Sequence, residues 1–170
     1  MNNNNSSVNA LRFTNDELMV IGIMILMMLD HSLEVLQYLP IMVEEAVNSI
    51  PAYNASQKVA IGKLLEKVTK LKYGDLVKLF EDQTKNIVLP DFSYDEKIIL
   101  GNCMCGTKLD GEFVQCLDMD VVDYIHYDLN RNVLVGEDHK FVVKVRSLDY
   151  AQRIKLLYLV KKEFFAKGIL

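Results

Sequence analysis

Residues 13–29 read Phe-Thr-Asn-Asp-Glu-Leu-Met-Val-Ile-Gly-Ile-Met-Ile-Leu-Met-Met-Leu, so a helix-start motif leads directly into a run of 12 apolar residues. The Thr14 hydroxyl can accept from the amide of Glu17, whose carboxylate can reach back to the amide of Thr14. This is the pattern of a capping box. A helix that is apolar on all sides is usually buried in a core or in an oligomer interface. The run is shorter than the about 20 residues that cross a bilayer, so we expect no membrane insertion.

The helix-start motif occurs again as Phe92–Glu96, with the sequence Phe-Ser-Tyr-Asp-Glu. Two further starts, Asn54–Gln57 and Asp149–Gln152, place glutamine three residues after the capping residue. Apolar residues follow these two starts in step, which indicates that the two helices are related. The paired motifs predict two pseudo-repeated helical halves, residues 13–89 and 90–170.

The remaining patterns complete the expected architecture. Residues 1–12 are rich in Asn and Ser and have no apolar pattern, so we expect a disordered tail. The chain has 51% apolar and 25% charged residues, as ordinary globular proteins do. We predict a mainly α-helical bundle of about five to seven helices. The apolar residues on either side of Gly136–His139 also predict one small β-hairpin near residues 132–145.

Each half of the chain is acidic first and basic last. Residues 13–57 contain six acidic and no basic residues, whereas residues 58–72 contain five lysines and one acid. Acids outnumber bases 11 to 3 in residues 91–138, and bases outnumber acids 8 to 2 in residues 139–167. Either oppositely charged helices pack beside each other within one fold, or a charged helix face recruits a partner.

The second interpretation gives the leading functional hypothesis, a non-enzymatic protein-interaction or regulatory module. Short capped helices after an Asn-rich start are in keeping with small inhibitor proteins of phages and mobile elements. A net charge of −4 makes nucleic acid an unlikely partner, so we expect another protein. The alternative for these basic faces is that they are merely solvated. The candidate partner-binding residues are Lys58, Lys63, Lys67, Lys70, Arg153 and Lys161.

The alternative function is a metal-dependent enzyme or small-ligand binder that uses the acidic stretch Asp118–Asp128. The candidate metal ligands there are Asp120, Asp123 and His126, which recur three residues apart on a helix. A catalytic metal site needs a converging set of carboxylates and imidazoles with an open position for water. The other ligands of such a set are not evident, and an acidic, solvated helix face explains the same residues.

Two other features bear on cofactors, compartment and assembly. The three cysteines, Cys103, Cys105 and Cys116, have no metal or redox spacing, which favours a reducing, cytoplasmic setting. No glycine-rich phosphate loop is present, and we expect no cofactor. The C-terminal stretch, residues 150–166, has apolar residues on more than one side, as residues 18–29 do. Two such helices in a small chain predict a homo-oligomer.

Overall fold

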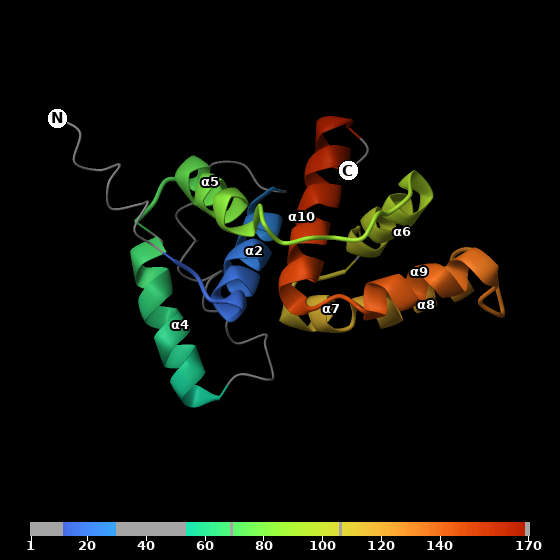
Figure 1. Cartoon of the computed structure of the whole chain (residues 1–170), viewed down its shortest axis with the longest axis horizontal. Coiled ribbons are helices and arrows are strands. Elements are labelled where there is room, and N and C mark those ends of the chain that lie inside the picture. Colours follow the sequence, from blue (N-terminus) through green and yellow to red (C-terminus); the bar gives the residue numbers. More distant parts are fainter. Residues whose placement is uncertain (1–11, 30–53, 69, 106, 169–170) are drawn as a thin grey trace.

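The computed structural model describes residues 12–29, 54–68, 70–105 and 107–168. These residues form helices and no strand, so the prediction of a mainly α-helical fold is confirmed (Figure 1). In chain order the helices are α2 (Asn15–Leu29), α4 (Ala55–Val68), α5 (Tyr73–Thr84), α6 (Tyr94–Met104), α7 (Gly111–Gln115), α8 (Leu117–Tyr127), α9 (Gly136–Arg146) and α10 (Tyr150–Ala166).

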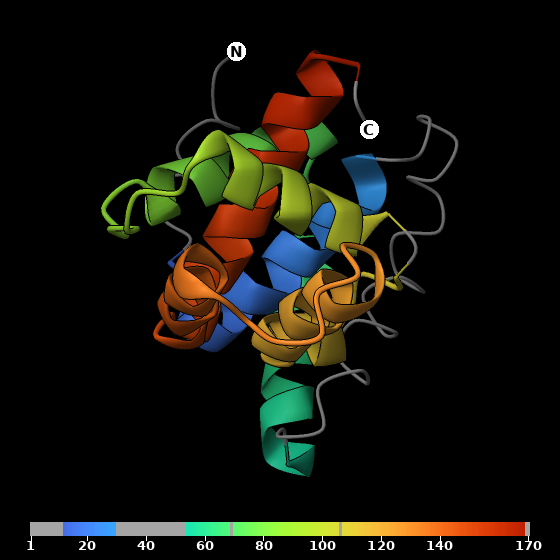
Figure 2. The same cartoon turned by 90° about the vertical axis from the view of Figure 1, so that its right-hand side faces the viewer.

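The packing is organised around α2 and α10, which lie against each other at the centre of the molecule (Figures 1 and 2). Their contact is unusually close at Gly22, where an added Cβ would lie 2.3 Å from Ile154 Cγ1. Helix α6 approaches the other side of α10 in the same manner. A Cβ on Gly101 would lie 2.7 Å from the ring of Phe164. Glycine therefore sets the spacing of both helix pairs, since any larger residue would collide with buried side chains.

The apolar run in α2 is buried within its own chain. Apart from Gly22, all its side chains from Leu18 to Leu26 are buried hydrophobics of the core. They belong to one cluster with residues of α5 to α10, including Phe80, Phe141 and Phe164. Other helices of the same chain therefore bury the described side chains of this run. None of the described helices is long and apolar enough to span a membrane.

All four helix starts inferred from sequence are capped by reciprocal side-chain hydrogen bonds, so this prediction is confirmed. In each, the side-chain oxygen of the capping residue accepts from a backbone amide three residues later, at 2.8–3.2 Å. The later residue's side-chain oxygen accepts from the capping residue's own amide, at 2.8–3.0 Å. The pairs are Thr14 with Glu17, Asn54 with Gln57, Ser93 with Glu96 and Asp149 with Gln152.

The predicted β-hairpin near residues 132–145 is wrong, because residues 136–146 form helix α9. Val135 has an extended backbone before the helix, and Glu137 and Asp138 place negative charge in its first turn. Phe141, Val142 and Val145 are buried at the i, i+1 and i+4 spacing of one helix face, whereas in a strand Phe141 and Val142 would point to opposite sides. Packing of this face against α8 selects the helix.

The division into halves at residues 89 and 90 stays a prediction. Helix α10, from the second half, packs against α2 of the first half as well as against α6 of its own. The two halves thus share one hydrophobic cluster. The expected tail, residues 1–12, lies outside the described residues except for Arg12.

Candidate binding surfaces

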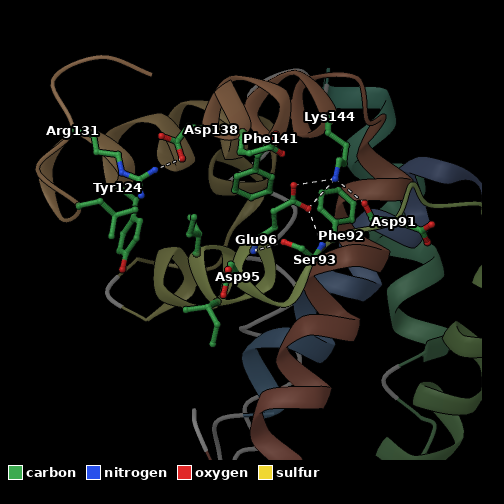
Figure 3. A pocket seen from close by; sticks show the side chains of 14 residues that line it. Asp91, Phe92, Ser93, Asp95, Glu96, Tyr124, Arg131, Asp138, Phe141 and Lys144 are labelled. Atoms are coloured by element: carbon green, nitrogen blue, oxygen red, sulfur yellow. Dashed lines mark hydrogen bonds and ion pairs between the residues drawn. The ribbon is translucent and has the colours of Figure 1, made fainter. Parts of the chain in front are cut away.

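A groove of about 800 Å³ opens between α6, α9 and the C-terminal end of α8 (Figure 3). We call it the α6–α9 groove. Its floor and walls include three aromatic side chains, Phe92, Tyr124 and Phe141. Five carboxylate residues and two cationic residues also line it. Ligand sites commonly have about 300–1,000 Å³ of space and combine apolar walls with a few placed polar groups.

On one wall of the groove, several groups together bind the ammonium of Lys144. Its ammonium donates to both carboxylate oxygens of Glu96, at 2.8 and 3.0 Å, and to the backbone oxygen of Asp91, at 2.7 Å. The same ammonium lies 4.9 Å from the centre of the Phe92 ring. Glu96 also closes the capping box of α6, so its carboxylate is fixed in orientation (Figure 3). The arrangement holds an ammonium by charge, hydrogen bonds and an aromatic face.

A second cation pair lies further along the groove, between Arg131 and Asp138. Asn130, with a φ of 52°, turns the chain just before Arg131. The arginine donates to Asp138 Oδ1, and only 8% of the Asp138 side chain is exposed. The second oxygen, Asp138 Oδ2, is buried and has no hydrogen-bond partner among the described residues. A buried carboxylate oxygen without a donor is unfavourable, so this atom is a spare acceptor.

The remaining charge of the groove is negative. Asp91 and Asp95 are exposed, and their carboxylates form no ion pair within the described part of the chain. Glu137 pairs with Lys140 at 2.8 Å on an exposed surface, where water screens the pair. Once Lys140 is counted with the lining residues, five carboxylates against three cations leave a net charge of about −2 around the groove. The groove therefore attracts positive charge and repels phosphates.

Aliphatic side chains also line the groove. Ile98 and Ile99 come from α6, and the exposed Leu129 follows the end of α8. Leu134, further along the chain, packs against the core and anchors the segment before α9. The groove thus combines carboxylates with aromatic and aliphatic side chains.

The predicted partner-binding lysines around α4 lie on the other side of the α2–α10 pair from the groove (Figure 1). Lys63 and Lys70 are exposed, and Lys58 is half-buried. None of these three lysines forms an ion pair within the part of the chain that the structure describes. The side chain of Lys67 lies outside the described set. Among the described helices, α4 takes part in none of the extensive helix contacts.

The two other predicted partner-binding residues, Arg153 and Lys161, are buried in α10. Arg153 donates to the backbone oxygens of residues 114, 115 and 148, at 3.1, 2.6 and 3.3 Å, and lies 3.5 Å from the Asp118 carboxylate. Lys161 donates to the backbone oxygen of Leu26 at 2.8 Å. Both cations therefore join α10 to neighbouring segments and present little surface to a partner in this conformation.

The candidate metal ligands Asp120, Asp123 and His126 all lie on α8. Among the described residues, no group of three or more His, Cys, Asp and Glu side chains is placed to hold a metal ion. Burial and the nearby charges of Asp123 and Asp118 raise the pKa of Asp120. Asp123 is exposed and His126 is half-buried. The structure thus places these residues along one acidic helix without drawing them to a common point.

Burial keeps the thiol of Cys103, which contacts Asp120, in its protonated form. Cys103 is buried, and its thiol donates to the Asp120 backbone oxygen at 3.7 Å. Burial and the negative charges of Asp120 and Asp128 raise the pKa of Cys103 to about 12. The thiolate is the nucleophilic and metal-binding form, so this thiol is inert near neutral pH.

Sequence inspection missed the α6–α9 groove because the hairpin prediction removed Asp138 and Lys144 from any helix. As members of a helix, Asp138, Phe141 and Lys144 are spaced by three residues and share a face. This three-residue spacing is the sequence pattern that could have predicted a shared helix face at the groove. The proximity of Lys144 to Glu96 is a tertiary contact across 48 residues, which no local pattern encodes.

No protein-family model, curated protein or solved structure matches this chain. The charged surfaces of α4 and of the groove are therefore the basis for assigning a role.

Proposed function

We propose that this protein is a non-enzymatic protein-interaction module that binds an acidic partner protein through the basic face at α4. The observation that carries the proposal is the exposure of Lys63 and Lys70 without a counter-ion in the described residues. Lys63 lies within α4 and Lys70 follows the end of the helix. Lys58 adds a third charge in the first turn. We call the basic set Lys58, Lys63 and Lys70 the α4 stripe.

The position of α4 supports this role. The helix stands at the edge of the molecule, apart from the α2–α10 pair (Figures 1 and 2). Lysines on an exposed helix cost nothing in desolvation until a partner arrives, and they speed the encounter with an acidic surface. A protein partner is favoured over nucleic acid because the chain as a whole carries a charge of −4.

We further propose that the protein works in a reducing compartment such as the cytoplasm. The support is that Cys103, Cys105 and Cys116 are free thiols, one of them exposed. Disulfides would be expected among cysteines of a small protein in an oxidising compartment.

The proposal is tested by comparing what three purified baits retain from a lysate of the native host. The baits are the unmodified protein, the double variant Lys63→Glu/Lys70→Glu, and the control Lys108→Glu. Lys108 is exposed, lies outside α4 and forms no ion pair in the described residues. We expect a protein that the unmodified chain and the control retain, and that the double variant loses. Equal retention by all three baits would show that α4 is not part of the binding surface.

A conservative variant separates charge from folding. Lys63→Arg/Lys70→Arg keeps both charges and should retain the same protein, because a long-range charge contact tolerates the exchange. Circular dichroism of each bait checks that helix content is unchanged. Loss of binding in the arginine variant would show that charge is not what the partner recognises.

A further inference from the structure

We propose that the α6–α9 groove is a second binding site, which receives a basic segment of a partner protein with its arginine or lysine side chains directed inward. This inference goes beyond the α4 surface and uses none of its residues. The site and the α4 stripe have opposite charges and lie on opposite sides of the α2–α10 pair (Figure 1).

The groove already binds cations of its own chain, which shows the chemistry that it offers. Lys144 is held by the Glu96 carboxylate, a backbone oxygen and the Phe92 ring. Arg131 is held by Asp138. Each contact pairs a nitrogen cation with a negatively charged or aromatic group, and such contacts strengthen where water is partly excluded. An incoming basic side chain would find the same kinds of partner beside them.

Acceptors remain after the chain's own cations are placed. Asp138 Oδ2 is buried without a donor although its residue lines the groove. The Arg131 side chain, which holds the other oxygen, is 46% exposed and has room to turn toward solvent. Asp91 and Asp95 add two carboxylates without ion-pair partners in the described residues. An N–H donor that reached Asp138 would relieve the cost of its unpaired oxygen.

The apolar lining of the groove indicates a protein segment as the occupant. Ile98, Ile99 and Leu129 line it together with the carboxylates. A peptide that alternates basic and apolar side chains can place the first kind on the carboxylates and the second on these apolar side chains. Phosphate-bearing ligands, including nucleic acids and anionic membranes, are disfavoured by the net negative charge.

The test is fluorescence anisotropy with a labelled, acetylated and amidated nonapeptide that alternates arginine and valine. The matched peptide has citrulline, which is uncharged, in place of each arginine. We expect saturable binding of the arginine peptide that weakens with added salt, and no comparable binding of the citrulline peptide. Equal binding of both peptides would overturn the proposal, since the groove would then recognise only the apolar residues.

Two double variants place the site on the molecule. Asp91→Asn/Asp95→Asn removes two carboxylates of the groove, and Glu112→Gln/Asp123→Asn removes two exposed carboxylates that do not line it. We expect the first to weaken binding about fivefold or more and the second to change it less than about twofold. Equal weakening by both would mean that overall negative charge attracts the peptide, and the groove proposal would be rejected.

Two further variants complete the design. Asp138→Asn retains the shape of the side chain but replaces one acceptor with a donor, so it should weaken the peptide complex. Where that buried change lowers folded stability, the exposed Asp91→Asn/Asp95→Asn pair still decides the outcome. Lys63→Glu/Lys70→Glu should bind the peptide no more weakly than the unmodified protein. Failure of the groove therefore stays distinguishable from failure of the α4 proposal.

Discussion

Gly22 of α2 and Ile154 of α10 approach so closely that a Cβ on the glycine would lie 2.3 Å from Ile154 Cγ1. The Phe80 ring is the next neighbour, at 3.1 Å. Ile154 and Phe80 are both fully buried, so neither can turn away into solvent. The central helix pair thus has no space for a single added methyl group.

Gly22→Ala should therefore destabilise the protein. Overpacking a core costs about 1–3 kcal/mol, and the higher helix propensity of alanine offsets at most about 1 kcal/mol of it. Urea unfolding followed by circular dichroism measures the difference. Gly62→Ala in α4 is the matched control, because a Cβ there meets no described atom within 4 Å. The control should gain up to about 1 kcal/mol; equal losses in both variants would contradict the close-packing explanation.

Lys161→Met should destabilise the fold more than Lys162→Met. The Lys161 ammonium is buried and donates to the Leu26 backbone oxygen, so its removal leaves a buried carbonyl without this donor. We expect a cost of about 1–3 kcal/mol. Lys162 pairs with Glu81 on a largely exposed side chain, and such pairs contribute about 0–1 kcal/mol. Thermal or urea unfolding of the two variants decides the order, and a reversed order would argue against a structural role for Lys161.

Asp120→Asn should stabilise the protein at neutral pH and have little effect in acid. Burial and the charges of Asp123 and Asp118 raise the pKa of Asp120 in the folded state. A raised pKa means that the folded protein binds this proton more tightly than the unfolded chain does. The resulting stabilisation is present below the unfolded pKa and is lost as the pH rises through the folded pKa.

Asp120→Asn removes the titrating carboxyl, so the variant does not lose this stability as the pH rises. Because Asp120 is only partly buried and water screens its charge, we expect a small gain in the free energy of unfolding at pH 7. Urea unfolding at pH 7 and near pH 3 measures the free energy of unfolding above and below the pH range in which Asp120 titrates. A variant equally stabilised at both pH values would show that a cause other than titration is responsible.

Self-association should depend on salt, if the expected homo-oligomer forms by contact of its charged surfaces. The α4 stripe is basic and the α6–α9 groove is acidic, so two copies can approach with unlike charges facing. Light scattering at about 20 mM and about 500 mM salt should then show a larger mass at low salt. Lys63→Glu/Lys70→Glu should abolish the difference. A monomer at all protein concentrations and both salt levels would end the homo-oligomer prediction.

Hydrogen bonds between residues close in sequence are predictable from the sequence, whereas contacts between distant segments are not. The capping box at Thr14 needs only a carboxylate three residues later, so four residues contain the whole interaction. The hairpin prediction failed because the short apolar stretch 141–145 is compatible with a strand as well as with a helix, and packing against α8 decides between them.

The buried cations of α10 show a different limit. The sequence predicts a binding face for Arg153 and Lys161 because charged side chains are usually exposed. Apolar residues occur on more than one side of α10, and these two cations lie among the buried ones, whereas Lys162 of the same helix is exposed. The backbone oxygens that receive these cations, those of Val114, Gln115 and Leu26, belong to segments distant in sequence. No local pattern could have named them.

The pairing of α2 with α10 also sets an order of events during translation. The backbone oxygen of Leu26 accepts a hydrogen bond from Lys161, which the ribosome adds 135 residues later. At typical rates of 5–20 residues per second, roughly 7–30 s pass before the partner helix is made. During that interval the apolar side chains from Leu18 to Leu26 lack the helix that covers them. The apolar segment of α2 is therefore synthesised well before the helix that covers it, and we expect chaperones that shield exposed apolar segments to bind there.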